Sequence, residues 1–157
     1  MILAFVFTLA LAVTAGPDPD RAAFETLKGM AGDWRDTLNP ERPMQVSYRT
    51  IANDSAVVET WRTPSGRETL TLYVMDGDTL IATHYCAQGN QPTLELVSAD
   101  NGLRFAFRSA TNLSDPSRSH QHAFNILMLG NGHVVHDETY VEDAESETTR
   151  YEFVRER

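Results

Sequence analysis

From residue 33 to the C-terminus, apolar and polar residues alternate along the chain with a period of two. This period is typical of strands with one buried face, and the runs are rich in Thr, Val, Tyr and Phe, which favour strands. Phe24, Leu27 and Met30 recur earlier at helical spacing, which predicts one short helix over residues 21–30. The alternation predicts about ten strands, over residues 33–37, 44–52, 56–63, 68–76, 79–87, 93–99, 103–112, 119–129, 133–142 and 146–156.

Asp-Gly and Asn-Gly pairs separate several of the predicted strands. Asp76-Gly77, Asn101-Gly102 and Asn131-Gly132 each lie between apolar runs, and such pairs tolerate the positive φ angles of tight hairpin turns. Because short turns make consecutive strands antiparallel neighbours and an open sheet leaves two unpaired edges, we predict a closed form. The expected fold is all-β, an antiparallel up-and-down barrel of about ten strands with one short N-terminal helix. The alternative is an open, strongly bent sheet wrapped on the helix.

The first 15 residues form an apolar run without a charged side chain. This run is shorter than the roughly 20 residues that a membrane-spanning helix needs. Val13 and Ala15 occupy the small-residue positions expected before a cleavage site, and Gly16-Pro17 follows them. We therefore predict a signal peptide over residues 1–15, a single barrel domain over residues 16–157, and a periplasmic or secreted mature protein that is not associated with a membrane.

Composition narrows the function classes further. The chain has 157 residues, of which 41% are hydrophobic and 22% are charged, as expected for one globular domain. Its formal net charge of −9 argues against nucleic acid as a partner, and its one cysteine excludes an internal disulfide. Composition does not predict the oligomeric state. An acidic stretch near the C-terminus is predicted to form a solvated hairpin; it contains Glu138, Glu142, Asp143, Glu145 and Glu147.

Two segments carry a resemblance to known proteins. Gly32-Asp33-Trp34, on the first predicted strand, looks like the Gly-x-Trp signature of lipocalins and fatty-acid-binding proteins, in which the Trp closes the barrel floor. Residues 84–92, HYCAQGNQP, preceded by residues 55–60, are similar to a group of uncharacterised bacterial lipocalin-like proteins. The haem-binding barrels called nitrobindins share the general shape. Arg35-Asp36 stands where nitrobindins carry small glycine-containing turns, which argues against haem.

A two-residue turn at Asp76-Gly77 predicts the pairing of the flanking strands. It sets Met75 opposite Asp78 and Tyr73 opposite Leu80. Both faces of this hairpin are apolar enough to be buried, and we assign the face of His84 and Cys86 to the interior, partly from the resemblance. The same alternation directs other side chains into the lumen. The residues expected to contact a ligand are Trp34, Glu59, Trp61, Tyr73, His84, Cys86, Asn90, Gln91, Phe105 and Phe107.

Such a lumen combines apolar walls with a few polar groups, which suits a small molecule. The favoured function is binding of a small, mostly apolar ligand. The first alternative is a barrel enzyme that uses Glu59 and His84 for proton transfer, although no known catalytic motif is present. The second is a haem or transition-metal carrier, with His120 and His122 as metal candidates because they are predicted to share an inward face with Phe124. No cofactor is expected in the favoured reading.

Overall fold

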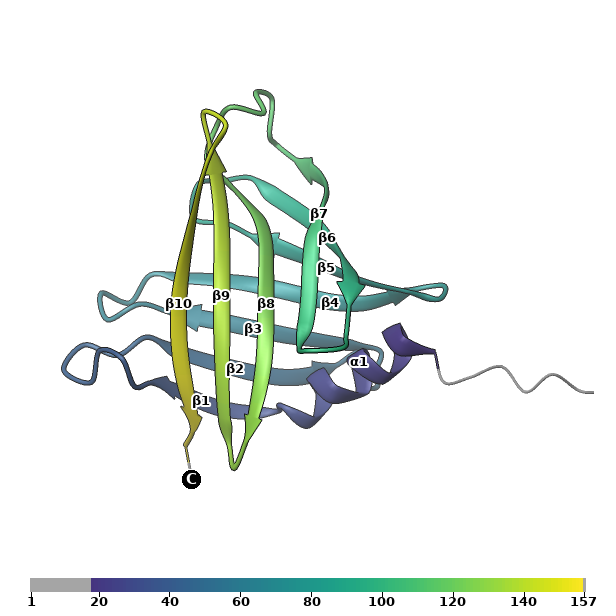
Figure 1. The fold of residues 1–157 in the computed structure, drawn as a ribbon, viewed down its shortest axis with the longest axis vertical. Helices are drawn as coiled ribbons and strands as arrows, with labels where there is room; N and C mark the ends of the chain where they lie inside the picture. Colours follow the sequence, from purple (N-terminus) through teal and green to yellow (C-terminus); the bar gives the residue numbers. More distant parts are fainter. Residues whose placement is uncertain (1–17, 157) are drawn as a thin grey trace, which may run out of the picture.

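The computed structural model describes residues 18–156, which form a closed antiparallel barrel with one helix (Figure 1). The predicted signal peptide lies outside these residues. Consecutive strands are neighbours throughout, and β1 pairs with β10 to close the barrel, so the predicted fold class is confirmed. The elements are α1 (Pro19–Gly29), β1 (Gly32–Asp36), β2 (Gln45–Ile51), β3 (Ala56–Arg62), β4 (Glu68–Asp76), β5 (Thr79–Tyr85), β6 (Gln91–Ser98), β7 (Leu103–Thr111), β8 (His120–Gly130), β9 (His133–Glu142) and β10 (Glu145–Arg155).

The strands form two layers that cross at a steep angle. In Figure 1, β2–β4 run across the view and β8–β10 run nearly perpendicular to them. Within residues 18–156, no helix is long and apolar enough to cross a membrane.

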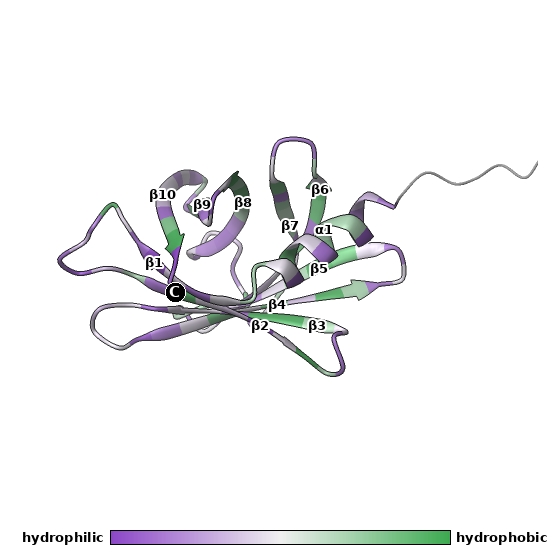
Figure 2. Ribbon diagram, turned by 90° about the horizontal axis from the view of Figure 1, so that it is seen from below, coloured by the Kyte–Doolittle hydropathy of each residue, from purple (hydrophilic) through white to green (hydrophobic). Residues whose placement is uncertain are grey.

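The helix α1 closes one end of the barrel. Asp18 caps it by accepting from the backbone N–H of Asp20 at 3.1 Å. Its apolar face, Ala23, Phe24 and Leu27, is buried against the barrel interior. Figure 2 shows α1 lying across this end, and its contacts are with β2, β4 and β5.

Trp34 and Arg155 complete the closed end. The Trp34 indole donates to the Met30 carbonyl at 2.9 Å, and the Arg155 guanidinium lies 4.4 Å from the centre of its ring. The same guanidinium donates to the Gly29 carbonyl at 2.9 Å and to that of Ala31, which supports the C-terminal end of α1. The arrangement is compatible with a lipocalin-like barrel.

The β4–β5 hairpin corrects one prediction. Its turn residues are Gly77-Asp78, with Gly77 at φ 62, so Asp76 pairs with Thr79 and Met75 with Leu80. The pairing predicted for an Asp76-Gly77 turn is therefore wrong by two residues. Because side chains alternate with a period of two, a shift of two leaves the faces unchanged. The prediction that the face with His84 and Cys86 points inward is confirmed by the burial of both side chains.

A β-bulge in β8 corrects a second prediction. Gln121 pairs with Tyr140 and Ala123 with Thr139, so His122 is the extra residue. The bulge turns Gln121 to the face of Phe124, where it is buried, and leaves His122 exposed. The prediction that His120 and His122 share the inward face of Phe124 is therefore wrong.

Candidate functional site

The end of the barrel opposite α1 holds a cavity of about 210 Å³. Residues from the β1–β2, β3–β4 and β5–β6 connections rim it, including Met44, Thr63, Arg67 and Gln88. Side chains from the strands form its walls: Trp61, Thr69, His84, Cys86, Gln121, Glu138, Tyr140 and Tyr151. The volume is below the roughly 300–1,000 Å³ of sites for drug-sized ligands.

A second hollow, of about 670 Å³, lies on the outer face of β1–β4. Its lining includes the exposed side chains of Arg49, Arg62 and Glu68. Arg62 and Glu68 pair with each other there. None of the described residues that line this hollow is a buried polar residue, whereas buried His84 and Gln121 line the inner cavity. The inner cavity is the stronger candidate site.

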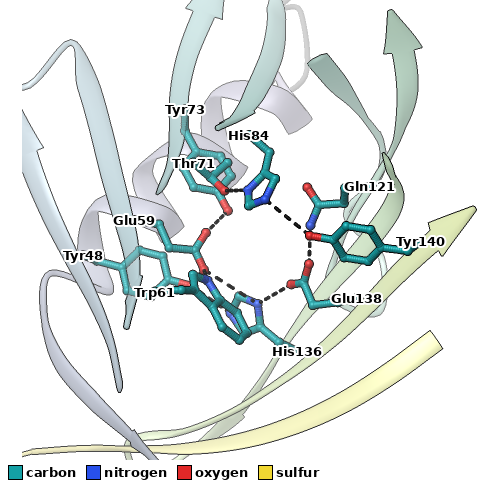
Figure 3. Close-up of polar contacts among 10 residues, drawn as sticks. All are labelled: Tyr48, Glu59, Trp61, Thr71, Tyr73, His84, Gln121, His136, Glu138 and Tyr140. Carbon is teal, nitrogen blue, oxygen red and sulfur yellow. Dashed lines mark hydrogen bonds and ion pairs between the residues drawn. The ribbon is translucent and has the colours of Figure 1, made fainter. Parts of the chain in front are cut away.

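A buried carboxylate organises the interior behind the cavity. Glu59 accepts from the Tyr48 hydroxyl at 2.9 Å, from the Trp61 indole at 2.5 Å and from the Tyr73 hydroxyl (Figure 3). Burial, and then the charge of Glu59, raises the pKa of Tyr48 and of Tyr73 well above the usual value of a phenol. Both hydroxyls therefore stay protonated and serve Glu59 as donors.

His136 links this carboxylate to a second one. Its Nε2 lies 2.8 Å from the Tyr48 hydroxyl, and its Nδ1 lies 3.2 Å from Glu138 Oε1 and 3.9 Å from Glu59 Oε1. Because the single Tyr48 proton goes to Glu59, Nε2 must donate to Tyr48, and Nδ1 must donate to the carboxylate of Glu138. Both ring nitrogens then carry protons, so His136 is an imidazolium.

The electrostatics of the site agree with this proton count. Burial alone lowers the pKa of His136, but its hydrogen bond to Glu138 and the charges of Glu59 and Glu138 outweigh burial. The net result is a raised pKa. His136 therefore carries its charge inside the barrel, between two carboxylates.

His84 forms a separate branch on the other side of the site. Its Nδ1 lies 3.0 Å from the Thr71 hydroxyl, and its Nε2 lies 3.3 Å from that of Tyr140 (Figure 3). Burial lowers the pKa of His84 to about 4, against an opposing effect of the Glu59 charge. His84 is thus neutral at neutral pH. Cys86 Sγ lies 3.8 Å from the same Tyr140 hydroxyl and contacts Gln88.

Gln121 ends the network on the cavity wall. Its Nε2 donates to Glu138 Oε2, and Figure 3 shows its Oε1 directed away from Glu138. Within residues 18–156 this buried oxygen has no hydrogen-bond partner. Gln121 is 3% exposed, and the side chain of Glu138 is 13% exposed. An acceptor buried without a donor is costly, and a bound donor would relieve the cost.

The structure separates the predicted ligand contacts into groups. Trp61, His84 and Cys86 line the cavity. Glu59 and Tyr73 are buried and do not line it, and their polar atoms are engaged with each other. The ring nitrogens of His84 are taken by Thr71 and Tyr140, so Glu59 and His84 belong to different branches of the network.

Other predicted contacts lie away from the cavity lining. Trp34 is at the closed end, and Phe105 packs in the core, stacked on Phe124 with centroids 4.5 Å apart. Phe107 is half-buried and stacks on His122 at 5.2 Å.

Asn90 and Gln91 make contacts within the barrel end. Asn90 donates to the Ser119 carbonyl at 2.9 Å, which ties the β5–β6 connection to the start of β8. Gln91, the first residue of β6, donates to the Gly89 carbonyl at 3.0 Å.

Several residues of the site were absent from the predicted contacts, among them Gln121, His136, Glu138 and Tyr140. Alternation along β9 already puts His136, Glu138 and Tyr140 on one face, opposite Asp137 and Thr139. The prediction that Glu138 belongs to a solvated hairpin is wrong, since Glu138 is half-buried, whereas Glu142, Asp143, Glu145 and Glu147 are exposed. Gln121 faces inward because of the bulge in β8, and the alternation of residues along this strand does not predict a bulge.

The prediction of a metal at His120 and His122 stays untested. His120 Nε2 lies 3.3 Å from His122 Nδ1. Among the described residues, no group of three or more His, Cys, Asp or Glu side chains is arranged to hold a metal ion.

No protein-family model matches the sequence, and no curated protein matches it either.

Proposed function

We propose that this chain is an exported small-molecule-binding barrel whose ligand occupies the cavity between Trp61, His84 and Glu138. The observation that carries the proposal is the unpartnered oxygen of Gln121 on the cavity wall. The neighbouring buried groups of Glu59, His84 and His136 have hydrogen-bond partners, so a bound donor would complete the network at Gln121.

The site supports a ligand that is smaller and more polar than the mostly apolar ligand expected from the sequence. The α1 half of the lumen is filled by side chains such as Phe24, Tyr73 and Phe105. The free space of about 210 Å³ is lined both by aromatic side chains, such as Trp61 and Tyr151, and by polar ones, such as Gln121 and Glu138. Compact ligands with one aromatic or aliphatic body and one polar group suit such a space.

Cys86 gives a direct test, because it is the one cysteine of the chain and it lines the cavity. The purified protein is treated with methyl methanethiosulfonate, and the gain in intact mass is followed over time. Small aromatic probes are expected to slow labelling of Cys86 in a saturable way. Cys86→Ser controls for labelling elsewhere. Labelling that no probe slows at any concentration would overturn the proposal.

Export depends on the predicted signal peptide. Expression of residues 1–157 in a bacterial host is expected to yield an exported protein. Its intact mass is expected to match that of residues 16–157, with Gly16 as the first residue. Retention of the uncleaved chain in the cytosol would contradict this part of the proposal and leave ligand binding open to the Cys86 test.

A further inference from the structure

The cavity wall formed by β8 and β9 presents one buried acceptor without a donor, Gln121 Oε1, beside a carboxylate. Gln121 uses its N–H₂ group on Glu138, so the orientation of the amide is fixed and Oε1 is left over. Glu138 lies beside it, with one oxygen toward Gln121 and the other toward His136. A ligand group that donates N–H bonds would meet both residues at once.

The charges of the interior favour a cation at this wall. Glu59 and Glu138 are two carboxylates, and His136 between them supplies one positive charge. One negative charge is left in a site that is largely shielded from water, where charges interact strongly. Arg67 is the cation at the rim, but its side chain is exposed and its charge is solvated.

Aromatic side chains also line the cavity. Trp61 and Tyr151 meet edge to face, with ring centroids 5.0 Å apart, and both line the cavity. The indole N–H of Trp61 is engaged with Glu59, so Trp61 offers the ligand an apolar ring. Such rings pack against an aromatic body and also attract a cation near their faces.

We infer that the ligand is a small organic cation with N–H groups, an amidine or a protonated amine, which donates to Gln121 Oε1 beside the Glu138 carboxylate. This inference rests on the proposed function and names the class of ligand for the same cavity.

The test compares four probes that share a benzene ring and differ in their polar group: benzamidine, benzylamine, benzyl alcohol and benzoate. Each is titrated against the wild-type protein by isothermal calorimetry, with protection of Cys86 as the second readout. The two cations are expected to bind at least about tenfold more tightly than benzyl alcohol, and benzoate is expected to bind most weakly.

Two variants test the residues. Glu138→Gln removes the negative charge and keeps the shape, so the preference for benzamidine over benzyl alcohol is expected to fall by about tenfold. Gln121→Met removes the amide oxygen at similar volume and is expected to weaken benzamidine more than benzyl alcohol. Glu142→Gln is the matched control, because it makes the same charge change on β9 at an exposed position. It is expected to leave all four affinities unchanged.

The outcomes separate the inference from the proposed function. Binding of all four probes with equal affinity, or a preference for benzoate, overturns the inference while the cavity still binds ligands. An absence of binding by every probe, together with unprotected Cys86, overturns both. If Glu138→Gln does not fold, the ranking of the probes on the wild-type protein alone decides the question.

Discussion

The imidazole of His136 lies 3.2 Å from the carboxylate of Glu138, two positions along the same strand, at the point where the buried network meets the cavity. Residues two apart on a strand point to the same side, so the pair is set by the pleat of β9. Its other neighbours, Tyr48 and Glu59, come from β2 and β3 across the barrel. The pair therefore links the charged groups of the buried network, Glu59 and His136, to the Glu138 carboxylate that lines the cavity.

The first prediction concerns His136 and pH. Its pKa is raised in the folded protein, so the stability that its charge contributes is fully present below about pH 6.5 and is lost as pH rises through the folded pKa. The wild-type protein is expected to have a higher free energy of unfolding than His136→Gln at pH 6. This difference, the margin, is expected to shrink toward pH 9. Urea unfolding of both proteins across this range measures the margin. A margin that stays constant or grows with pH would show that His136 is neutral when folded.

The second prediction concerns His84, whose titration has the opposite sign. Because burial lowers its pKa to about 4, folding keeps His84 neutral while the unfolded chain takes up a proton below about pH 6.5. This difference lowers the free energy of unfolding. The loss is absent above pH 6.5 and grows to the order of 3 kcal/mol near pH 4. Replacement by Gln removes this loss.

The stability of His84→Gln relative to wild type is therefore expected to improve as pH falls from 7 to 4, again by urea unfolding. His133→Gln, at an exposed position, serves as the control for a lost histidine. A relative stability of His84→Gln that does not change with pH would rule out a buried neutral His84.

The third prediction concerns Glu59. Gln at this position places an N–H₂ group or a neutral oxygen against the donors of Tyr48, Trp61 and Tyr73, so at least one buried group loses its partner. The expected loss of stability is about 1–3 kcal/mol. Glu95→Gln makes the same change at a side chain that is 42% exposed, and it is expected to change stability by less than about 0.5 kcal/mol. Equal effects of the two substitutions would show that the Glu59 carboxylate is not needed for folding.

The fold was predictable because its information is local. Alternation of period two located all ten strands within two residues at most of their ends, and Asn131-Gly132 forms the turn expected between β8 and β9. The pairing of β4 with β5 was missed by two residues, since one glycine can occupy either central position of a tight turn. The inward face survived this error because the error was an even number of residues.

The site was predictable only in part because it depends on contacts between distant strands. Trp61, His84 and Cys86 reach the cavity as their alternation indicated. Gln121 does so only because the bulge at His122 reverses the faces of β8, and bulges leave no simple mark in composition. Glu138 was misjudged because acidic residues surround it in sequence, whereas its burial comes from its pairing with Phe124 of β8.

The last prediction concerns the closed end of the barrel, where Gly32 has φ 134 and a Cβ would lie 2.9 Å from Arg155 Nη1. A side chain at this φ is strained whatever the space, so Gly32→Ala is expected to cost about 1–3 kcal/mol. Arg155→Ala removes the cation over Trp34 and the two bonds to the carbonyls of Gly29 and Ala31, at an expected cost of about 1–2 kcal/mol.

The two costs are expected not to add, because the steric part of the Gly32 substitution is absent when Arg155 is truncated. In the double variant the loss should be smaller than the sum by about 0.5 kcal/mol or more. Guanidinium chloride unfolding, followed by tryptophan fluorescence, gives the four free energies of the cycle. Arg155→Lys distinguishes the two roles of the arginine, since Lys keeps the charge near Trp34 and cannot span both carbonyls. Full additivity would mean that Arg155 moves aside freely, and the glycine would then be required for its backbone conformation alone.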